Sequence, residues 1–204
     1  MKPRDRVLAA LNHEVPDRCP MQISFTPEFA SRLRSELGQT RTSVRNPQGR
    51  ENTFELECAL GEDLLLSPVG FVNSRYIKDP CGDGASTYTD DWGVKWRDIE
   101  YQTRFGTGVY TEMTAHPLAE DAAIEAYKSP DPNRPELYEE AEMLVRDYKS
   151  ERWIVGMTVC TIFETAWALR GYERLLTDLV HNPELAERIL DIPFRYHLTA
   201  AQKL

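Results

Sequence analysis

The sequence predicts an α/β protein, and among α/β folds it favours a (β/α)8 barrel. The first observation is the segment 153–171, W-I-V-G-M-T-V-C-T-I-F-E-T-A-W-A-L-R-G, in which a β-branched and aromatic run passes directly into a helical pattern that ends at Gly171. The second is that strand-like runs alternate with helical patterns along the chain. The third is that neither G-x-G-x-x-G nor G-x-x-x-x-G-K-[ST] occurs, which weakens the nucleotide-binding doubly wound folds.

Helices are predicted from capping residues and from apolar spacing. The segment 26–38 carries the fullest set of signals, because Thr26 is an N-cap, Pro27 takes the first helical position and Gly38 follows the last turn. The expected helices and their apolar faces are 4–13 (Val7, Leu8, Leu11), 26–38 (Phe29, Leu33, Leu37), 54–60, 135–148 (Leu137, Ala141, Leu144, Val145, Tyr148), 172–181 and 182–192.

Three short apolar runs, 19–25, 63–67 and 153–159, are predicted to be buried parallel strands, because continuous apolarity suits a strand that is covered on both faces. Between the second and the third, 87–101 places aromatic residues around Asp90 and Asp91 and predicts an inserted aromatic β-hairpin. Because a full barrel takes roughly 250 residues, we expect these 204 residues to supply only its first strands and helices. They would form a single partial domain, with a leading helix (1–18), two strand–helix units (19–86), the hairpin (87–101) and a third unit with its following helices (102–204).

Composition limits the classes of partner. The 33 acidic and 24 basic side chains give a net charge of −9, which argues against a nucleic acid or an anionic membrane surface as the main partner. The four cysteines are far apart, with no C-x-x-C or H-x-C pair, so neither a disulfide framework nor a zinc ribbon is predicted. The charged amino terminus and the lack of a long apolar run predict a cytoplasmic protein without a membrane span.

Four motifs in order resemble the uroporphyrinogen decarboxylase-like superfamily. They are K-P-R-D-R-V-L-A-A-L-N-H-E-V-P-D-R-C-P (2–20), A-L-G-E-D-L-L-L (59–66), D-D-W-G-V-K-W (90–96) and R-G-Y-E-R-L-L-T-D-L-V-H-N-P-E-L (170–185). The resemblance covers nearly the whole chain. It implies the (β/α)8 barrel of that superfamily, which includes tetrapyrrole decarboxylases and cobalamin-dependent methyltransferases.

The chain departs from the true decarboxylases at three places. Their M-R-Q-A-G-R loop corresponds here to 21–26, M-Q-I-S-F-T, which has no arginine, although arginines would meet the carboxylates of the tetrapyrrole. Their essential aspartate follows the second strand, which here ends L-S-P-V. Their tyrosine in the next strand–helix unit aligns with Trp167. Uroporphyrinogen decarboxylation therefore stays the alternative interpretation.

The resemblance is nearer to the methyltransferase members. Those proteins hold a zinc ion that activates a thiol for methyl transfer from or to a corrinoid cobalt. Their H-x-C pair and later cysteine lie in the second half of the barrel, so no metal ligand is expected within this chain. The resemblance implies zinc as cofactor and a corrinoid protein, a second chain completing the barrel, or a second copy in a homodimer as partner. A non-catalytic split subunit or pseudoenzyme that binds a partner chain is the alternative from another class.

Six residues at or after the ends of predicted strands are candidate substrate-binding residues, and no catalytic residue is assigned: Ser24, Phe25, Ser67, Thr158, Glu164 and Trp167. Each also has a structural interpretation. Glu164 suits the first turn of a helix, where an acid is favoured by the helix dipole, or it contacts substrate or metal. Trp167 is core or pocket wall. Ser24 and Ser67 bind either a ligand or their own loop backbone.

Two further groups of residues are interpreted as structural. Trp92 and Trp96 suit cross-strand packing better than ligand stacking. Cys160, just past the third strand, is more typical of a small buried apolar residue than of a nucleophile or ligand. The four histidines have no partner at metal-ligand spacing, so they are predicted to be structural or solvated.

Overall fold

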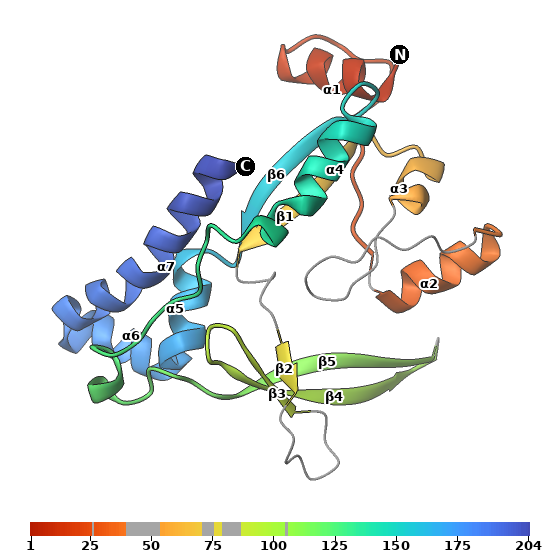
Figure 1. Cartoon of the computed structure of the whole chain (residues 1–204). Helices are drawn as coiled ribbons and strands as arrows, with labels where there is room; N and C mark the ends of the chain where they lie inside the picture. The colour runs from red at the N-terminus through yellow and green to blue at the C-terminus, as the bar shows by residue number, and fades with distance from the viewer. Residues whose placement is uncertain (26, 40–53, 71–75, 79–86, 105) are drawn as a thin grey trace. The chain divides into compact units, whose positions relative to one another are not determined.

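The computed structural model describes residues 1–25, 27–39, 54–70, 76–78, 87–104 and 106–204 (Figure 1). The described chain is a mixed α/β protein with a two-stranded sheet, β1-β6, and a four-stranded sheet, β2-β3-β4-β5. Neither sheet closes on itself in this part of the chain. Two compact units are present, one comprising 1–68, 135–157 and 204, and the other 69–134 and 158–203. We call them unit 1 and unit 2.

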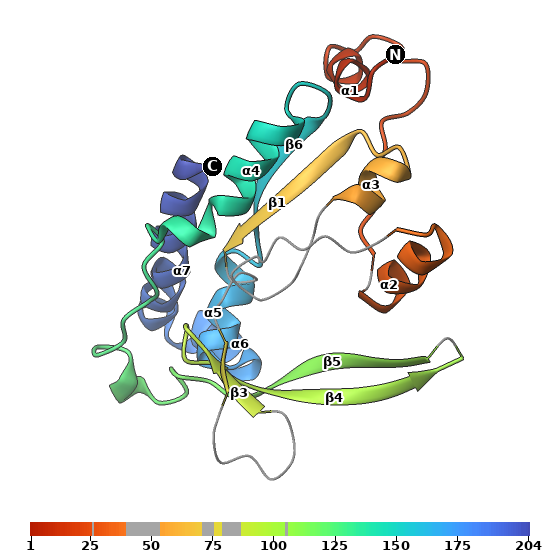
Figure 2. The same cartoon turned by 45° about the vertical axis from the view of Figure 1, so that its right-hand side comes forward.

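The described part of unit 1 contains four α-helices and the start of a two-stranded sheet. Its helices are α1 (Pro3–Leu11), α2 (Pro27–Glu36), α3 (Glu55–Ala59) and α4 (Glu139–Tyr148), the last preceded by a 3-10 turn at Pro135–Leu137. The strands β1 (Leu64–Gly70) and β6 (Trp153–Val159) both begin in this unit. They run in the same direction (Figures 1 and 2), which is the parallel pairing that the apolar runs predict.

The core of unit 1 joins α3, β1 and α4. Phe54, Leu65 and Leu144 are buried against one another, with Cys58, Met143, Tyr148 and Ile154 packed around them. Several apolar residues that the sequence places on buried helix faces are instead exposed: Leu8, Leu11, Phe29, Leu37 and Val145. The periodic spacing locates these helices correctly, but it overestimates how much of each apolar face is covered.

The predicted strand at 19–25 is wrong, because this segment joins no sheet. Its main chain is held by Asp63 instead. The Met21 N–H donates to Asp63 Oδ2 over 2.8 Å, and the Met21 carbonyl accepts a 2.8 Å hydrogen bond from the Asp63 N–H. These bonds take the Met21 groups that a strand ladder would use, so the segment stays extended without strand pairing. Ile23 is accordingly exposed, not buried.

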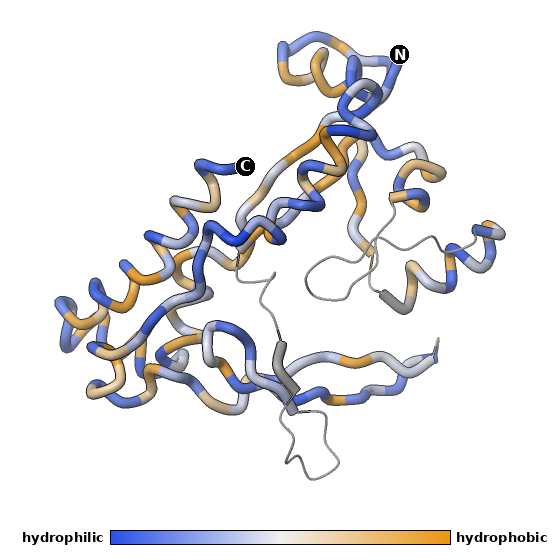
Figure 3. Tube along the Cα trace, in the orientation of Figure 1, coloured by the Kyte–Doolittle hydropathy of each residue, from blue (hydrophilic) through white to orange (hydrophobic). Residues whose placement is uncertain are grey.

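Unit 2 contains an antiparallel sheet that is larger than the predicted hairpin. Its strands are β2 (Tyr76–Lys78), β3 (Thr87–Asp90), β4 (Lys95–Thr103) and β5 (Gly106–Ala115), each antiparallel to the next. The hairpin over 87–101 is thus confirmed as β3 and β4, whereas β2 and β5 are additional. Figure 3 shows why the sequence does not predict β5, since the tube along this strand is mostly pale or hydrophilic in colour, unlike β1 and β6.

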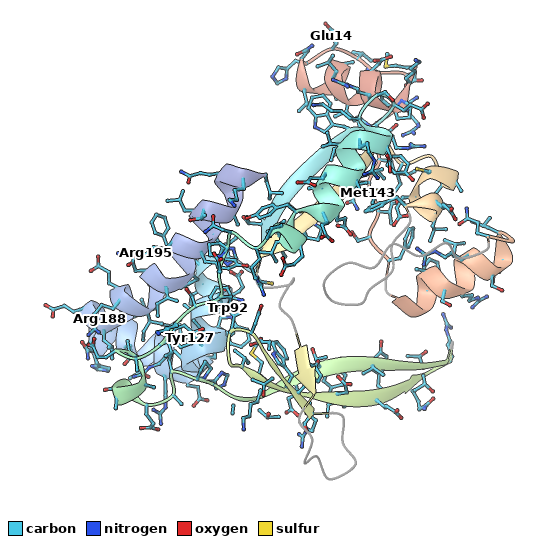
Figure 4. The ribbon with its side chains drawn as sticks, in the orientation of Figure 1. Glu14, Trp92, Tyr127, Met143, Arg188 and Arg195 are labelled. Atoms are coloured by element: carbon cyan, nitrogen blue, oxygen red, sulfur yellow. The ribbon has the colours of Figure 1, made fainter. Side chains whose placement is uncertain are left out.

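The turn between β3 and β4 is organised by Asp90. Its carboxylate accepts hydrogen bonds from the Trp92 N–H (3.0 Å), the Val94 N–H (2.9 Å) and Trp96 Nε1 (2.8 Å). Burial raises the pKa of Asp90 to about 6, although these donors oppose the shift. Trp92 is buried in the turn, and its carbonyl accepts a 2.8 Å hydrogen bond from the Tyr127 hydroxyl (Figure 4). The two tryptophans therefore have structural roles.

Three helices complete unit 2. They are α5 (Ile162–Arg170), α6 (Tyr172–His181) and α7 (Pro183–Lys203), with a 3-10 turn at Asp121–Ala123 before them. The prediction that the last helix ends at residue 192 is wrong, because α7 continues through Pro193 to Lys203. Pro193 is buried, as are Ile189, Tyr196 and Ala200, so packing along one face of α7 outweighs the hydrogen bond that the proline removes.

None of the described helices combines the length and hydrophobicity that a bilayer crossing requires.

Candidate functional site

The junction between β6 and α5 lies at the carboxyl end of a strand that takes part in parallel pairing, the position where α/β proteins place their ligand sites. Strand β6 ends at Val159, and Cys160 follows with φ of +52°. A non-glycine residue in this left-handed region stores strain, which concentrates at functional sites. Burial, with a smaller contribution from Glu164, raises the pKa of the Cys160 thiol, so it is protonated near neutral pH and is not an activated nucleophile.

The Thr165 hydroxyl and the His197 imidazole form a buried pair that contacts this junction. The Thr165 hydroxyl donates to the Cys160 carbonyl over 2.5 Å and lies 3.3 Å from His197 Nε2. Because the hydroxyl proton is already used, we infer that Nε2 is the protonated nitrogen and donates to Thr165. His197 Nδ1 is then an acceptor, and it has no hydrogen-bond partner among the described residues.

His197 is neutral at physiological pH. Burial lowers its pKa to about 4, against an opposing effect of Glu164. The imidazole is only 4% exposed and stacks on Trp92, with ring centroids 6.3 Å apart and an interplanar angle of 16°. The junction therefore holds a neutral imidazole in a fixed orientation, supported by the aromatic turn of the sheet.

The exposed side of the junction combines a carboxylate with aromatic rings. Glu164 is exposed in the first turn of α5, next to Phe163. The Trp167 ring lies edge-on to Tyr172, with centroids 5.9 Å apart, and Phe163 meets the same tyrosine at 6.4 Å. Phe163 and Tyr172 are themselves partly exposed. This surface provides a hydrogen-bond acceptor and apolar rings, which suit ligand binding more than acid–base chemistry.

The six predicted site residues are divided between the two units. Thr158, Glu164 and Trp167 lie in unit 2, where Thr158 is a half-buried residue of β6 and the other two are on α5. Ser24, Phe25 and Ser67 lie in unit 1. Ser24 is exposed and accepts a 3.1 Å hydrogen bond from the Gln22 amide, and the Phe25 ring packs on Phe29 at 5.7 Å. These contacts give Ser24 and Phe25 local packing roles and do not place them with Ser67.

Ser67 is fully buried in the middle of β1, beside an acid of α4, so the prediction that this strand ends at residue 67 is wrong. The Ser67 hydroxyl donates to Glu140 Oε1 over 3.4 Å. Burial raises the pKa of Glu140 to about 7, with Glu57 adding to the shift and the Ser67 hydroxyl opposing it. A carboxyl that titrates near neutral pH can accept or donate a proton, which makes this pair a second polar cluster, located at the middle of β1 and not at a strand end.

The two arginines nearest the segment 19–25 are engaged within the protein. Arg6 Nη1 binds Asp63 Oδ1 at 2.5 Å, and Arg18 Nη1 binds Asp63 Oδ2 at 2.6 Å. Arg6 also binds Asp17 through Nε at 2.5 Å. Their guanidinium groups are thus bound to carboxylates of the chain itself. Arg6 and Arg18 of the amino-terminal motif therefore have structural roles.

Among the residues that the structure describes, no group of three or more His, Cys, Asp or Glu side chains is arranged to hold a metal ion. Within the described part of the chain, no such group fits the zinc ion of the methyltransferase members. Comparison of the chain with protein-family models, with curated proteins and with solved structures gives no match.

His197 and Thr165 are the site residues that sequence reasoning missed. The signal that could have found His197 is the spacing of Ile189, Pro193, Tyr196, His197 and Ala200, which defines one buried face of a long helix. Placing a helix end at Pro193 hid this pattern. Thr165 has no comparable signal, because its role depends on contacts with Cys160 and with a residue 32 positions later.

Proposed function

We propose that this chain is the amino-terminal part of a (β/α)8 barrel of the uroporphyrinogen decarboxylase-like superfamily and that it is related to the members that carry out corrinoid-dependent methyl transfer to or from a thiol. The four motifs of the sequence support the superfamily. The same-direction pairing of β1 and β6, with a helix following β6, supports the strand–helix architecture. In this proposal the remaining strands come from further polypeptide.

The observation that carries the proposal is an exposed acid, Glu164, in the first turn of α5 after β6, on the same helix as Phe163 and Trp167, whose rings both contact Tyr172. A corrinoid has amide N–H groups at its edge, which a carboxylate can bind as an acceptor. Uroporphyrinogen has carboxylates at its edge, which Glu164 would repel. Trp167 and Tyr172 then supply apolar surface to the ring system. In this proposal the chain's own contribution is to bind and orient the ligand, because its described residues include no set of zinc ligands and Cys160 holds its proton.

A non-catalytic role as a partner-binding subunit is the second candidate. It is favoured by exposed apolar side chains on α6 and α7, which a partner could cover: Leu176, Leu179, Val180, Phe194 and Leu198.

Equilibrium dialysis of the chain against methylcobalamin and against uroporphyrin, both followed by their own absorbance, tests the proposal. We expect retention of methylcobalamin and not of uroporphyrin. We also expect Glu164→Gln to weaken the binding of methylcobalamin a few-fold, because an amide is a weaker acceptor than a carboxylate. Glu173→Gln is the matched control, since Glu173 is an exposed first-turn acid of α6.

Retention of uroporphyrin alone would contradict the proposal and favour the decarboxylase interpretation. Retention of neither ligand would contradict both enzymatic interpretations, the methyltransferase and the decarboxylase, and would favour the partner-binding role. Equal effects of Glu164→Gln and Glu173→Gln would remove the assignment of Glu164 to the site.

A further inference from the structure

Unit 1 contains a hollow of about 260 Å³ that involves the first part of β6 and not its carboxyl end. Its apolar wall comes from Ala141 and Val145 of α4, Trp153 and Ile154 of β6, and Leu204. The bare backbone of Gly156 belongs to the same wall, where an added Cβ would lie 3.1 Å from Leu204. The volume is just below the roughly 300–1,000 Å³ of sites for drug-sized ligands, so the hollow suits a smaller molecule.

The remaining lining residues are three cations, Arg4, Lys149 and Arg152, and among the described residues no Asp or Glu side chain lines the hollow. This is a concentration of positive charge in a chain whose net charge is −9. Among the described residues none of these cations forms an ion pair, whereas Arg6 and Arg18 of the same unit are paired with Asp63.

The two arginines are held in place by main-chain carbonyls. Arg4 Nη1 donates to the Lys149 carbonyl over 2.6 Å, and the Arg4 N–H donates to the Glu151 carbonyl over 2.9 Å. Arg152 donates to the carbonyls of Glu62 and Cys58. Neutral carbonyls fix the Arg4 guanidinium without cancelling its charge, whereas Arg152 also interacts electrostatically with Glu62. A site with fixed positive groups loses little side-chain entropy when an anion binds.

We propose that this hollow binds a small amphipathic anion, with a carboxylate held by Arg4 and Lys149 and an apolar body lying against Val145, Trp153 and Ile154. Burial of the ligand's apolar surface against this wall supplies affinity, and the cations favour an anionic ligand over a neutral or cationic one. The site is separate from the β6–α5 junction, because its β6 residues precede the end of that strand, and it does not depend on the function proposed for the junction.

Isothermal titration calorimetry with sodium octanoate tests the proposal, with octanol and octylammonium as neutral and cationic probes of the same chain length. We expect saturable binding of octanoate and at least tenfold weaker binding of the other two. Arg4→Gln should weaken octanoate about tenfold, because a charge-assisted hydrogen bond is lost. Lys149→Gln should weaken it about threefold, because Lys149 is exposed and its charge is screened.

Two sets of control variants distinguish binding in the hollow from nonspecific electrostatic attraction and from nonspecific hydrophobic binding elsewhere on the protein. Arg146→Gln makes the same charge change on the exposed side of α4, outside the hollow, and should leave octanoate binding unchanged. Val145→Trp should fill the hollow and abolish binding, whereas Val180→Trp, at a 74% exposed position of unit 2, should not.

Equal binding of octanol and octanoate would overturn the proposal, as would an equal loss in Arg4→Gln and Arg146→Gln. Unimpaired binding in Val145→Trp would place the ligand elsewhere and overturn it as well. If Arg4→Gln unfolds, as judged by circular dichroism, Lys149→Gln decides the role of the cations.

Discussion

Replacing Asp63 by alanine is expected to destabilise the protein by about 4 kcal/mol. The carboxylate is fully buried and accepts hydrogen bonds from Arg6 Nη1 (2.5 Å), Arg18 Nη1 (2.6 Å) and the Met21 N–H (2.8 Å). Removing one partner of a buried ion pair costs about 3–5 kcal/mol. Arg18 reduces the loss because its side chain is 43% exposed and regains water, whereas Arg6 and the Met21 N–H stay buried.

Urea denaturation followed by circular dichroism measures this loss. With a slope of about 2 kcal/mol per molar urea, 4 kcal/mol lowers the midpoint by about 2 M. Asp5→Ala is the matched control, because Asp5 is an exposed acid of α1 and its loss should change stability by less than about 0.5 kcal/mol. A midpoint shift for Asp63→Ala no larger than that of Asp5→Ala would refute the reasoning.

The stability difference between wild type and Asp63→Ala should change with pH in a defined direction. Burial by itself would raise the pKa of Asp63, but hydrogen bonds from Met21, Arg18 and Arg6 outweigh it and lower the pKa. The folded protein thus binds this proton less readily than the unfolded chain does. The stability that Asp63 contributes is full above the unfolded pKa of about 4 and is lost as the pH falls through the lower folded pKa. The difference between wild type and Asp63→Ala should therefore shrink in acid.

Two further predictions concern unit 2. His197 should titrate near pH 4 in two-dimensional NMR of the imidazole, and its contribution to stability should be full above about pH 6.5 and decline as the pH falls toward 4; a midpoint near 6.5 would contradict its burial. Arg170→Met should cost about 3–5 kcal/mol in urea denaturation, because the buried guanidinium binds Asp178 at 2.7 Å and Asp121 at 2.6 Å. Arg188→Met, at an exposed position of α7, is its control (Figure 4). An equal loss of unfolding free energy in both variants would contradict the prediction that the buried ion pairs of Arg170 stabilise the protein more than an exposed one does.

What the sequence predicts well is encoded by residues close together in the chain. The strand over 153–159 was placed with the bounds that the structure has, because its β-branched and aromatic run is continuous. Gly38 follows its helix as predicted, with φ of +64°. These signals need no knowledge of distant contacts.

The failures come from contacts between distant residues. The run 19–25 has the composition of a strand, yet Asp63 takes the Met21 groups that a neighbouring strand would use. Pro193 is a helix breaker by local rules, yet α7 passes through it because the buried face from Ile189 to Ala200 continues on both sides. In the candidate site, Glu164 and Trp167 could be found from their place after a strand, but the Thr165–His197 pair depends on how α5 and α7 pack.

The ion pairs of the other arginines provide a further argument for an anion site in the hollow of unit 1. In an acidic chain an arginine has many carboxylates available: Arg6 and Arg170 each bind two, and Arg188 binds one. Arg4 instead donates to the Lys149 carbonyl, and it lines a hollow that has further cations and, in the part of the chain that the structure describes, no Asp or Glu side chain. Three neighbouring positive charges repel one another, so the arrangement is destabilising unless something offsets the repulsion. An anion in the hollow would offset it, and the protein should then become more stable to heat as octanoate is added, an effect that Val145→Trp should abolish.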